Sequence, residues 1–264
     1  HAVVGLSIAV LMGEPVTISN PAVLGCIAGS VIPDGDIIMQ LKGDYIYLKN
    51  HRGMSHSLPA MLVYAASITG LLCLIFGSIA IRKVFLFSLV GCLSHIALDI
   101  TNSYGAQILW PLSKKRITLD LLLIYDPMLI VQCLLILIPA ARNIVPPAAS
   151  VLMFSFYLIH RYLMKNRAKK IALENLEDKY EFDYFRIMPS MIGLIKWHFI
   201  LKTDKEKVIG EVNLLPRRFR VINKMNNIDK KLYDMAINTP LARFFSQFTP
   251  IFHVDCEKKG DNYV

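Results

Sequence analysis

The feature that most constrains the fold of this chain is a stretch of almost unbroken apolar sequence at residues 58–81. A helix needs about 20 apolar residues to cross a hydrocarbon core of roughly 30 Å, and this stretch is long enough. Arg82 and Lys83 follow it, as basic residues do at a membrane surface. A second apolar run at residues 84–100 then returns across the bilayer. The sequence therefore predicts a helical membrane protein.

Further apolar runs continue this pattern over residues 1–164. Residues 2–11 and 21–32 are each too short to span a bilayer. We expect them to form two half-length helices that pack together through small residues such as Gly25, Ala28 and Gly29. Residues 33–50 are polar and rich in turn-forming residues, which indicates a loop. Residues 120–140 and 148–164 are expected to be a third and a fourth span.

Charged residues are distributed unevenly along the chain. Mean hydropathy is +0.45 although 19% of the residues are charged, and charge is dense beyond residue 164. We therefore expect a membrane domain at 1–164, a charged linker helix at 165–180 and a soluble domain at 181–264. Residues 186–201, 208–212 and 218–222 are typical of strands, and residues 229–238 and 240–248 of helices. The predicted fold class is mainly α, a polytopic helical membrane domain followed by a small C-terminal α+β soluble domain.

The basic residues also predict the orientation of the chain. If the segment that holds His51 is on one side of the bilayer, the basic residues at 114–116 and 165–170 lie on that side, opposite Arg82, Lys83 and Arg142. The side richer in Lys and Arg is the cytoplasmic one, so we expect the His51 segment and the C-terminal domain in the cytoplasm. Because the net charge of +9 lies largely in such flanks, nucleic acid is not an expected partner. The sequence gives no indication of oligomeric state.

Imidazole and carboxylate side chains recur through the apolar half of the chain, and no thiolate pair accompanies them. The candidate metal ligands are His1, Asp34, Asp36, His51, His56, His95, Asp99 and Asp126. A mixed set of this kind suits zinc, manganese or iron in a hydrolytic centre. His95 and Asp99 are four residues apart, so they share one face of a helix. The set exceeds what one ion needs, which predicts two divalent ions that clamp the attacking and leaving oxygens.

Several of these residues also have a structural interpretation. The Asp-Gly-Asp segment at 34–36 is typical of a turn, although in an extended loop both carboxylates would point the same way. Asp126 is equally suited to cap a helix. A lone His95 would be a hydrogen-bonded core residue, but Asp99 favours a ligand pair because a buried carboxylate needs a partner. The residues alone say little about His1.

The segment 51–57, His-Arg-Gly-Met-Ser-His-Ser, also holds residues suited to catalysis. Arg52 lies between two candidate ligands, where a guanidinium can hold a phosphate or carboxylate through two bonds. Its alternative role is to reach for lipid headgroups. Ser55 is a second catalytic candidate, and Gly53 is expected to provide the tight turn. Among the carboxylates, Asp36 is a candidate general base.

Three motifs occur in a fixed order over roughly the first 130 residues: Pro-Asp-Gly-Asp at 33–36, the 51–57 segment, and Ser-His-Ile-Ala-Leu-Asp at 94–99 followed by Leu-Trp-Pro-Leu at 109–112. This set resembles the YdjM-like family of membrane-bound, metal-dependent hydrolases. The resemblance implies that His1 belongs to the ligand set. It also implies a distant similarity to zinc-dependent phospholipase C and its nuclease relatives, and the long-tailed form resembles a bacterial subgroup.

These observations predict a metal-dependent hydrolase of the bacterial inner membrane, with the lipid bilayer as its first partner. The expected substrate is a phosphoester of a lipid or lipid-linked molecule, cleaved by a metal-activated water. The expected cofactor is a pair of divalent ions, zinc first and manganese or iron as alternatives. Arg52 would neutralise developing charge. The alternative hypothesis is a metal-binding membrane protein without catalysis, such as a transporter, a sensor or a scaffold.

Overall fold

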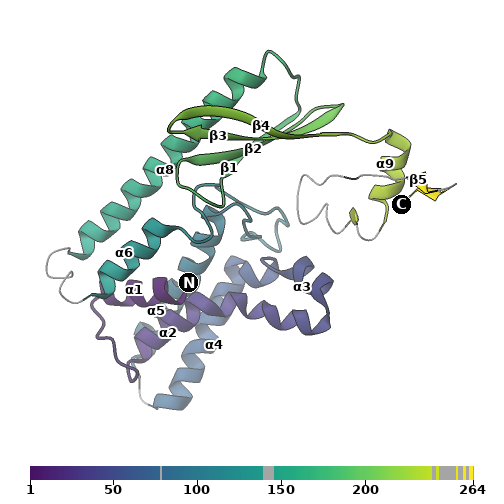
Figure 1. Cartoon of the computed structure of the whole chain (residues 1–264). Helices are drawn as coiled ribbons and strands as arrows, with labels where there is room; N and C mark the ends of the chain where they lie inside the picture. Colours follow the sequence, from purple (N-terminus) through teal and green to yellow (C-terminus); the bar gives the residue numbers. More distant parts are fainter. Residues whose placement is uncertain are drawn as a thin grey trace. The chain divides into compact units, whose positions relative to one another are not determined.

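The computed structural model describes residues 1–77, 79–138, 146–239, 242–243, 254, 258–259 and 262–263 (Figure 1). Most of the predicted helix at 240–248, and Arg142 of the orientation argument, lie outside the described residues. Contacts between residues divide the chain into two compact units, His1–Tyr162 and Leu163–Val264. Each unit is described below by itself.

The first unit is helical. Its helices include α1 (Ala2–Leu11), α2 (Pro21–Val31), α4 (Leu58–Phe76), α5 (Ile81–Thr101) and α6 (Pro127–Leu137). The predicted half-length helix at 2–11 and the two predicted spans at 58–81 and 84–100 are confirmed. The second helix was expected to be half-length, but α2 continues directly into a 3-10 helix, and the two together run over Pro21–Lys42. Both α2 and α4 begin with a side-chain cap and a proline in the first turn, and the capping residues are Asn20 and Ser57. These signals fix where each apolar run begins to coil.

Three helices among the described residues are long and apolar enough to cross a membrane: Pro21–Lys42, Leu58–Phe76 and Ile81–Thr101. The α4 helix exposes several large apolar side chains, with Leu74 at 85% and Val63 at 62%. A water-soluble fold would not leave such a helix face uncovered, whereas a face turned to lipid requires it. The first unit is therefore built to sit in a bilayer.

The region from residue 120 to 180 differs from its prediction in two ways. The expected third span at 120–140 is wrong, because α6 covers only Pro127–Leu137 and begins at a cap on Asp126. The expected fourth span and the expected linker helix are one continuous helix, α8 (Pro147–Leu176), of 30 residues. Lys, Arg and Glu are good helix formers, so a rise in charge does not by itself end a helix. Helix α8 therefore continues through residue 165 without a break.

The polar stretch at 33–50, predicted to be a loop, is helical. It forms the 3-10 helix η1 (Ile32–Lys42) and the short helix α3 (Asp44–Asn50), joined at Gly43 with φ of 106°. Pro33 is compatible with a first helical turn, and only a glycine adopts the reversal at residue 43 without strain. The Pro-Asp-Gly-Asp motif therefore begins a helical hairpin, named here the η1–α3 hairpin.

Helices α2 and α5 pack with their backbones in contact. A Cβ atom added to Gly29 would lie 2.2 Å from the carbonyl oxygen of Ser88, and one added to Gly91 would lie 2.2 Å from that of Cys26. We expected Gly25 and Gly29 to face α1, but both lie against α5, next to Ser88. Glycines at this interface let the two helices approach more closely than any side chain would allow.

The second unit is an antiparallel sheet covered by the end of α8. Its strands are β1 (Tyr184–Pro189), β2 (Lys196–Lys202), β3 (Glu206–Leu214) and β4 (Arg217–Asn226), in the order β1-β2-β3-β4 (Figure 1). Alternate residues of the strands, with Trp197 and Phe199 fully buried, pack against Ala168, Ala172 and Leu176 of α8. Helix α9 (Lys230–Ile237) and the short strands β5 (Lys258–Lys259) and β6 (Asn262–Tyr263) follow. The predicted strands and the helix at 229–238 are confirmed, with the run at 186–201 divided between β1 and β2.

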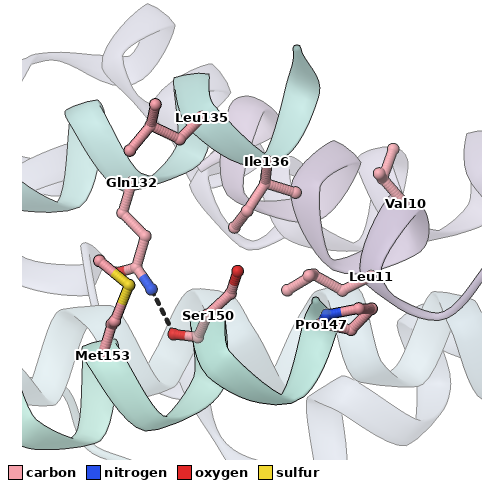
Figure 2. Close-up of a pocket in the computed structure, with 8 residues that line it drawn as sticks. All are labelled: Val10, Leu11, Gln132, Leu135, Ile136, Pro147, Ser150 and Met153. Atoms are coloured by element: carbon pink, nitrogen blue, oxygen red, sulfur yellow. Dashed lines mark hydrogen bonds between the residues drawn. The ribbon is translucent and has the colours of Figure 1, made fainter. Parts of the chain in front are cut away.

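A small cavity lies among α1, α6 and α8 in the first unit (Figure 2). It has a volume of about 60 Å³ and is lined mostly by apolar side chains, including Val10, Leu135 and Met153. Gln132 crosses it to donate a hydrogen bond to the carbonyl oxygen of Ser150. Ligand pockets are usually several times larger, roughly 300 Å³ or more. None of the candidate metal ligands lines this cavity, so it is not the functional site.

Candidate metal centre

Four segments of the first unit bring imidazoles and carboxylates together. Residue 1 precedes α1, η1 carries Asp34 and Asp36, the turn before α4 carries His51 and His56, and α5 carries His95 and Asp99. The side chains of His56, His95 and Asp99 are completely buried, with 0% exposure. Among the described residues two groups of three could hold a metal ion: His1, Asp34 and His95, and His56, His95 and Asp99.

Two buried imidazoles lie close to each other and to two carboxylates. Nε2 of His56 is 3.1 Å from Nε2 of His95, 3.2 Å from Oδ2 of Asp99 and 3.6 Å from Oδ1 of Asp34. Nε2 of His95 is 3.5 Å from each of those two carboxylate oxygens. In a tetrahedral zinc site with bonds of about 2.0–2.1 Å, neighbouring ligand atoms are about 3.3 Å apart. His56, His95 and Asp99 are therefore spaced as three ligands of one tetrahedral ion, and Asp34 belongs to the second candidate group of the described residues.

Hydrogen bonds orient both buried histidines with a free nitrogen toward the cluster. Nδ1 of His95 is 2.8 Å from the carbonyl oxygen of Ser30, an acceptor only, so this nitrogen carries the proton. Nδ1 of His56 is 2.9 Å from Oγ of Ser55, whose hydroxyl donates to Asp36 and must accept from the ring. Both Nε2 atoms are then unprotonated, as ligands of a metal must be.

Asp99 gives an independent indication of a cation. Both of its carboxylate oxygens are buried, and neither accepts a hydrogen bond of acceptable geometry from any part of the chain that the structure describes. The nearest compensation is NH2 of Arg52, 3.0 Å from Oδ1. Burying a carboxylate without full compensation is costly, and an ion bound at Oδ2 would remove that cost. The orphaned oxygens thus fit the donor set.

Arg52 is held by the structure in an unusual backbone conformation. Its φ is 57°, in the left-handed region that residues with a side chain rarely adopt. The conformation aims its NH1 at Oδ1 of Asn102, 3.1 Å away, and its backbone N–H at Oδ2 of Asp36. Gly53 allows the tight turn as expected, since a Cβ there would lie 2.7 Å from the carbonyl oxygen of Asn50, and Arg52 adds the left-handed residue. Strain at such a position is characteristic of functional sites.

Asp36 supports the cluster from outside. Its Oδ1 is 2.9 Å from Nδ1 of His51, and its Oδ2 accepts from Oγ of Ser55 at 2.8 Å and from the backbone N–H of Arg52 at 3.3 Å. With both oxygens engaged, Asp36 belongs to neither of the two candidate groups of the described residues, and the same is true of His51. Asp36 therefore orients the 51–56 segment.

His1 lies beside the buried cluster at its more open side. Its ring stacks on that of His95 with centroids 3.9 Å apart, and its Nε2 is 3.8 Å from Oδ1 of Asp99. The side chain of Asp34 is also partly open, at 41% exposure, whereas that of Asp99 is at 1%. The cluster is thus closed on the α5 side and open beside Asp34.

The structure places Asp126 in a different role. Its side chain accepts hydrogen bonds from the backbone N–H groups of Met128 and Leu129, which caps α6, and from the hydroxyl of Tyr157 on α8. Its carboxylate is therefore satisfied without an ion. It belongs to neither candidate group among the described residues. Of the two roles that the sequence allowed, the structure has the helix cap.

Two polar residues near the cluster were missed from the sequence. Asn102 accepts from Arg52 and from the backbone N–H groups of Tyr104 and Gly105, and so fixes the loop after α5. Arg116 donates from NH2 to the carbonyl oxygen of His51 at 2.8 Å. Asn102 could have been suspected because it follows Asp99 within one turn. Nothing in the basic cluster at 114–116 distinguishes Arg116 from its neighbours.

The charge around His56 determines how strongly this imidazole holds a proton, and therefore how well a metal ion competes for it. Burial lowers the pKa of this imidazole, but the carboxylates of Asp34 and Asp99 outweigh burial, and the net pKa lies above its ordinary value. In the protonated imidazolium the additional proton sits on Nε2, where a cation would have to displace it. Metal affinity at this nitrogen should therefore fall as the pH falls.

Comparison with known proteins agrees with this arrangement of motifs. The model of the family described as YdjM inner membrane protein matches residues 1–168, which contain every candidate ligand. The chain belongs to the YdjM inner membrane protein family. Among proteins similar to this YdjM family member is the uncharacterized protein YfhP of Bacillus subtilis (strain 168), 26% identical over 277 residues, covering 100% of this chain and 83% of YfhP. No solved structure matches significantly.

Proposed function

We propose that this YdjM family protein is a membrane-bound, metal-dependent hydrolase that cleaves a phosphoester in a lipid or lipid-linked substrate. The observation that supports the proposal is the group of donor atoms around two buried imidazoles. Nε2 of His56 and Nε2 of His95 are 3.1 Å apart, and each lies 3.2–3.6 Å from a carboxylate oxygen of Asp34 and of Asp99. When bound, a divalent ion polarises a phosphoryl oxygen and makes water acidic enough to attack at neutral pH. Imidazole with carboxylate favours zinc, and manganese or iron suits the same donors.

The donor set favours one ion more strongly than two. Because Nδ1 of His95 is engaged by Ser30, this residue offers a single nitrogen, yet it belongs to both candidate groups. We propose the first ion at His56, His95 and Asp99. A second ion would be left with two ligands that it does not share, the imidazole of His1 and the carboxylate of Asp34.

The remaining residues have distinct roles in the proposed reaction. Asp34 is the most exposed carboxylate of the cluster, so it is better placed than Asp36 to accept a proton from an attacking water. Arg52 points its guanidinium at the same cluster and can stabilise the charge that develops on a phosphoryl group. Ser55 acts through His56, because its hydroxyl lies between Asp36 and Nδ1 of that ring and so fixes the ring.

One observation favours the non-catalytic alternative. Four protein ligands around a tetrahedral ion would leave no open position, and closed sites are usually structural. The two functions differ in what they predict for Asp34. In a hydrolase Asp34 can leave the ion, so Asp34→Asn retains metal and loses turnover. In a closed binding site Asp34→Asn weakens metal binding as His56→Ala does.

The proposal is tested by a hydrolysis screen on purified protein in lipid. Phospholipids and a chromogenic phosphodiester are offered after loading with zinc, manganese or iron, and products are measured for wild type, Asp34→Asn, His56→Ala and His198→Ala. His198 lies in β2 of the other unit and is the matched control. We expect turnover in wild type and in the control alone. Equal turnover in wild type and His56→Ala would overturn the proposal.

The orientation of the chain is part of the proposal. The basic residues that flank the spans support a cytoplasmic location for the 51–57 segment and for the second unit. Substrate would then reach the centre from the cytoplasmic leaflet. A reporter fused after the C-terminus that is active only in the cytoplasm tests this, and activity of a periplasm-specific reporter would contradict it.

A further inference from the structure

The η1–α3 hairpin has a surface that the proposed reaction does not use. Four large apolar side chains of η1 and α3 are widely exposed: Ile37 at 55%, Ile38 at 69%, Leu41 at 88% and Ile46 at 37%. The hairpin is short and carries charged residues, so it was expected to be an aqueous loop. An exposed apolar group of this size next to a functional site marks an interaction surface.

The geometry of α2 and α5 places this surface at the edge of the bilayer. The two helices run parallel, since Gly25 lies against Val84 and Ser88, and Ser30 meets His95. Helix α5 ends at Thr101, six residues beyond His95, which is about 9 Å at a rise of 1.5 Å per residue. The 11 residues of η1 extend about 22 Å at the rise of a 3-10 helix. Helix η1 therefore passes the level where α5 ends near Gly35, and its outer half begins about 4 Å beyond that level, where the headgroup layer lies.

The charges of the hairpin match that location. Lys42 ends η1 and Lys49 lies near the end of α3, and both are exposed. Lysines that border an apolar surface at the end of a membrane helix extend toward lipid phosphates while their stems stay in the apolar layer. The base of the hairpin also contacts α4 and α5, the two other candidate spans. The apolar surface is thus continuous with lipid-facing helices.

We propose that the η1–α3 hairpin lies in the boundary between lipid headgroups and acyl chains, with Ile37, Ile38 and Leu41 in contact with the acyl chains. Asp34 and Asp36 lie at the start of this hairpin and His51 at its end. The candidate metal centre would then open beside lipid headgroups, and its substrate would be an amphiphile that diffuses in the same leaflet. This last step rests on the proposed hydrolase function, whereas the docking of the hairpin does not.

Accessibility to a thiol reagent tests the docking. Leu41→Cys and Ile38→Cys are compared with Lys42→Cys, the adjacent exposed control, in a Cys73→Ala/Cys256→Ser background that leaves only the buried Cys26, Cys92 and Cys133. Each protein is placed in nanodiscs, which expose both membrane faces, and reacted with a membrane-impermeant maleimide. Because an interfacial helix buries its apolar face about 5–10 Å deep, we expect Leu41→Cys and Ile38→Cys to react at least roughly tenfold more slowly than Lys42→Cys.

Two outcomes would overturn the inference. Equal rates for all three probes would mean that the hairpin stays in water. Protection that appears only in nanodiscs holding two copies, and is lost with one copy, would mean that a second chain covers the surface in place of lipid. The labelling needs no metal and no turnover. A protein that fails the hydrolysis screen can therefore still confirm the docking, and a protein with turnover can still refute it.

Discussion

Gly91→Ala is the substitution that best tests how the fold assembles the candidate centre. A Cβ at residue 91 would lie 2.2 Å from the carbonyl oxygen of Cys26, and real Cβ contacts essentially never fall under 3.0 Å. Helices α2 and α5 must therefore separate by about 0.8 Å, and overpacking of this kind costs about 1–3 kcal/mol. Ser30 on α2 accepts the hydrogen bond that orients His95 on α5. The 2.8 Å separation between its carbonyl oxygen and Nδ1 of His95 widens toward about 3.6 Å if the shift is transmitted fully, and at about 3.6 Å the hydrogen bond is lost.

The measured quantities are metal affinity and the temperature of unfolding. If the strain falls on the metal-bound state, about 1–3 kcal/mol corresponds to a loss of affinity of about 5- to 150-fold. Affinity is measured by competition with a chelator of known strength, and unfolding by heating in detergent. Gly70→Ala is the matched control, because Gly70 lies in α4 with nothing within 4 Å of its added Cβ. There the better helix propensity of alanine, worth about 1 kcal/mol, should leave stability unchanged or raised.

The reasoning would be refuted if Gly91→Ala bound metal as tightly as Gly70→Ala and unfolded at the same temperature. Such a result would mean that the backbone contact between α2 and α5 is not what sets the position of Ser30 relative to His95. If stability falls but metal affinity does not, the backbone shift caused by the new Cβ is absorbed within α2 and does not reach η1.

Three further predictions follow from individual contacts. Ser55→Ala removes the hydroxyl between His56 and Asp36, so metal affinity should fall about 10- to 100-fold; unchanged affinity in the chelator assay would contradict this. Asp126→Ala should cost about 0.5–2 kcal/mol as a lost helix cap and leave the metal content unchanged, whereas loss of metal would make Asp126 a ligand. Hydrogen bonds from Lys83 and Asn20 lower the pKa of Glu14, so its stabilising effect is present at neutral pH and is lost as the pH falls below about 4.5. Glu14→Gln should show less change in unfolding temperature between about pH 6 and about pH 3.5 than wild type, and an equal change would refute the assignment.

The sequence was most informative where a short-range rule decides the geometry. His95 and Asp99 are four residues apart in an apolar run that could only be a helix, and the structure places both side chains in one buried cluster. The spans at 58–81 and 84–100 were equally predictable from length and hydropathy. Five of the candidate ligands fall into the two groups of described residues that could hold an ion, and the ligand set itself stays a prediction.

The roles of Asp34 and Asp36 could not be predicted, because they depend on local conformation. In an extended loop two residues with one between them point the same way, and this was the expectation. In a 3-10 helix of three residues per turn they point about 120° apart. Asp34 therefore faces His56 and His95, while Asp36 faces His51 and Ser55.

Contacts between segments far apart in the chain could not be predicted from the sequence either. The proton on His95 is fixed by a backbone carbonyl of Ser30, 65 residues away, and any residue type supplies a carbonyl. The left-handed conformation of Arg52 had no signal either, because a glycine stood next to it and was the natural choice for the turn. Such features follow from how the helices pack, which local propensity does not encode.

Metal content is the measurement that tests the central claim most directly. Wild type, His56→Ala and the His198→Ala control are purified in detergent, loaded with zinc, freed of excess ion and analysed for metal per chain. We predict at least one tightly bound ion in wild type and in His198→Ala, and essentially none in His56→Ala, because His56 supplies a buried nitrogen 3.1 Å from that of His95. A folded wild-type protein that retains no ion, or a His56→Ala protein that retains as much as wild type, would contradict the account.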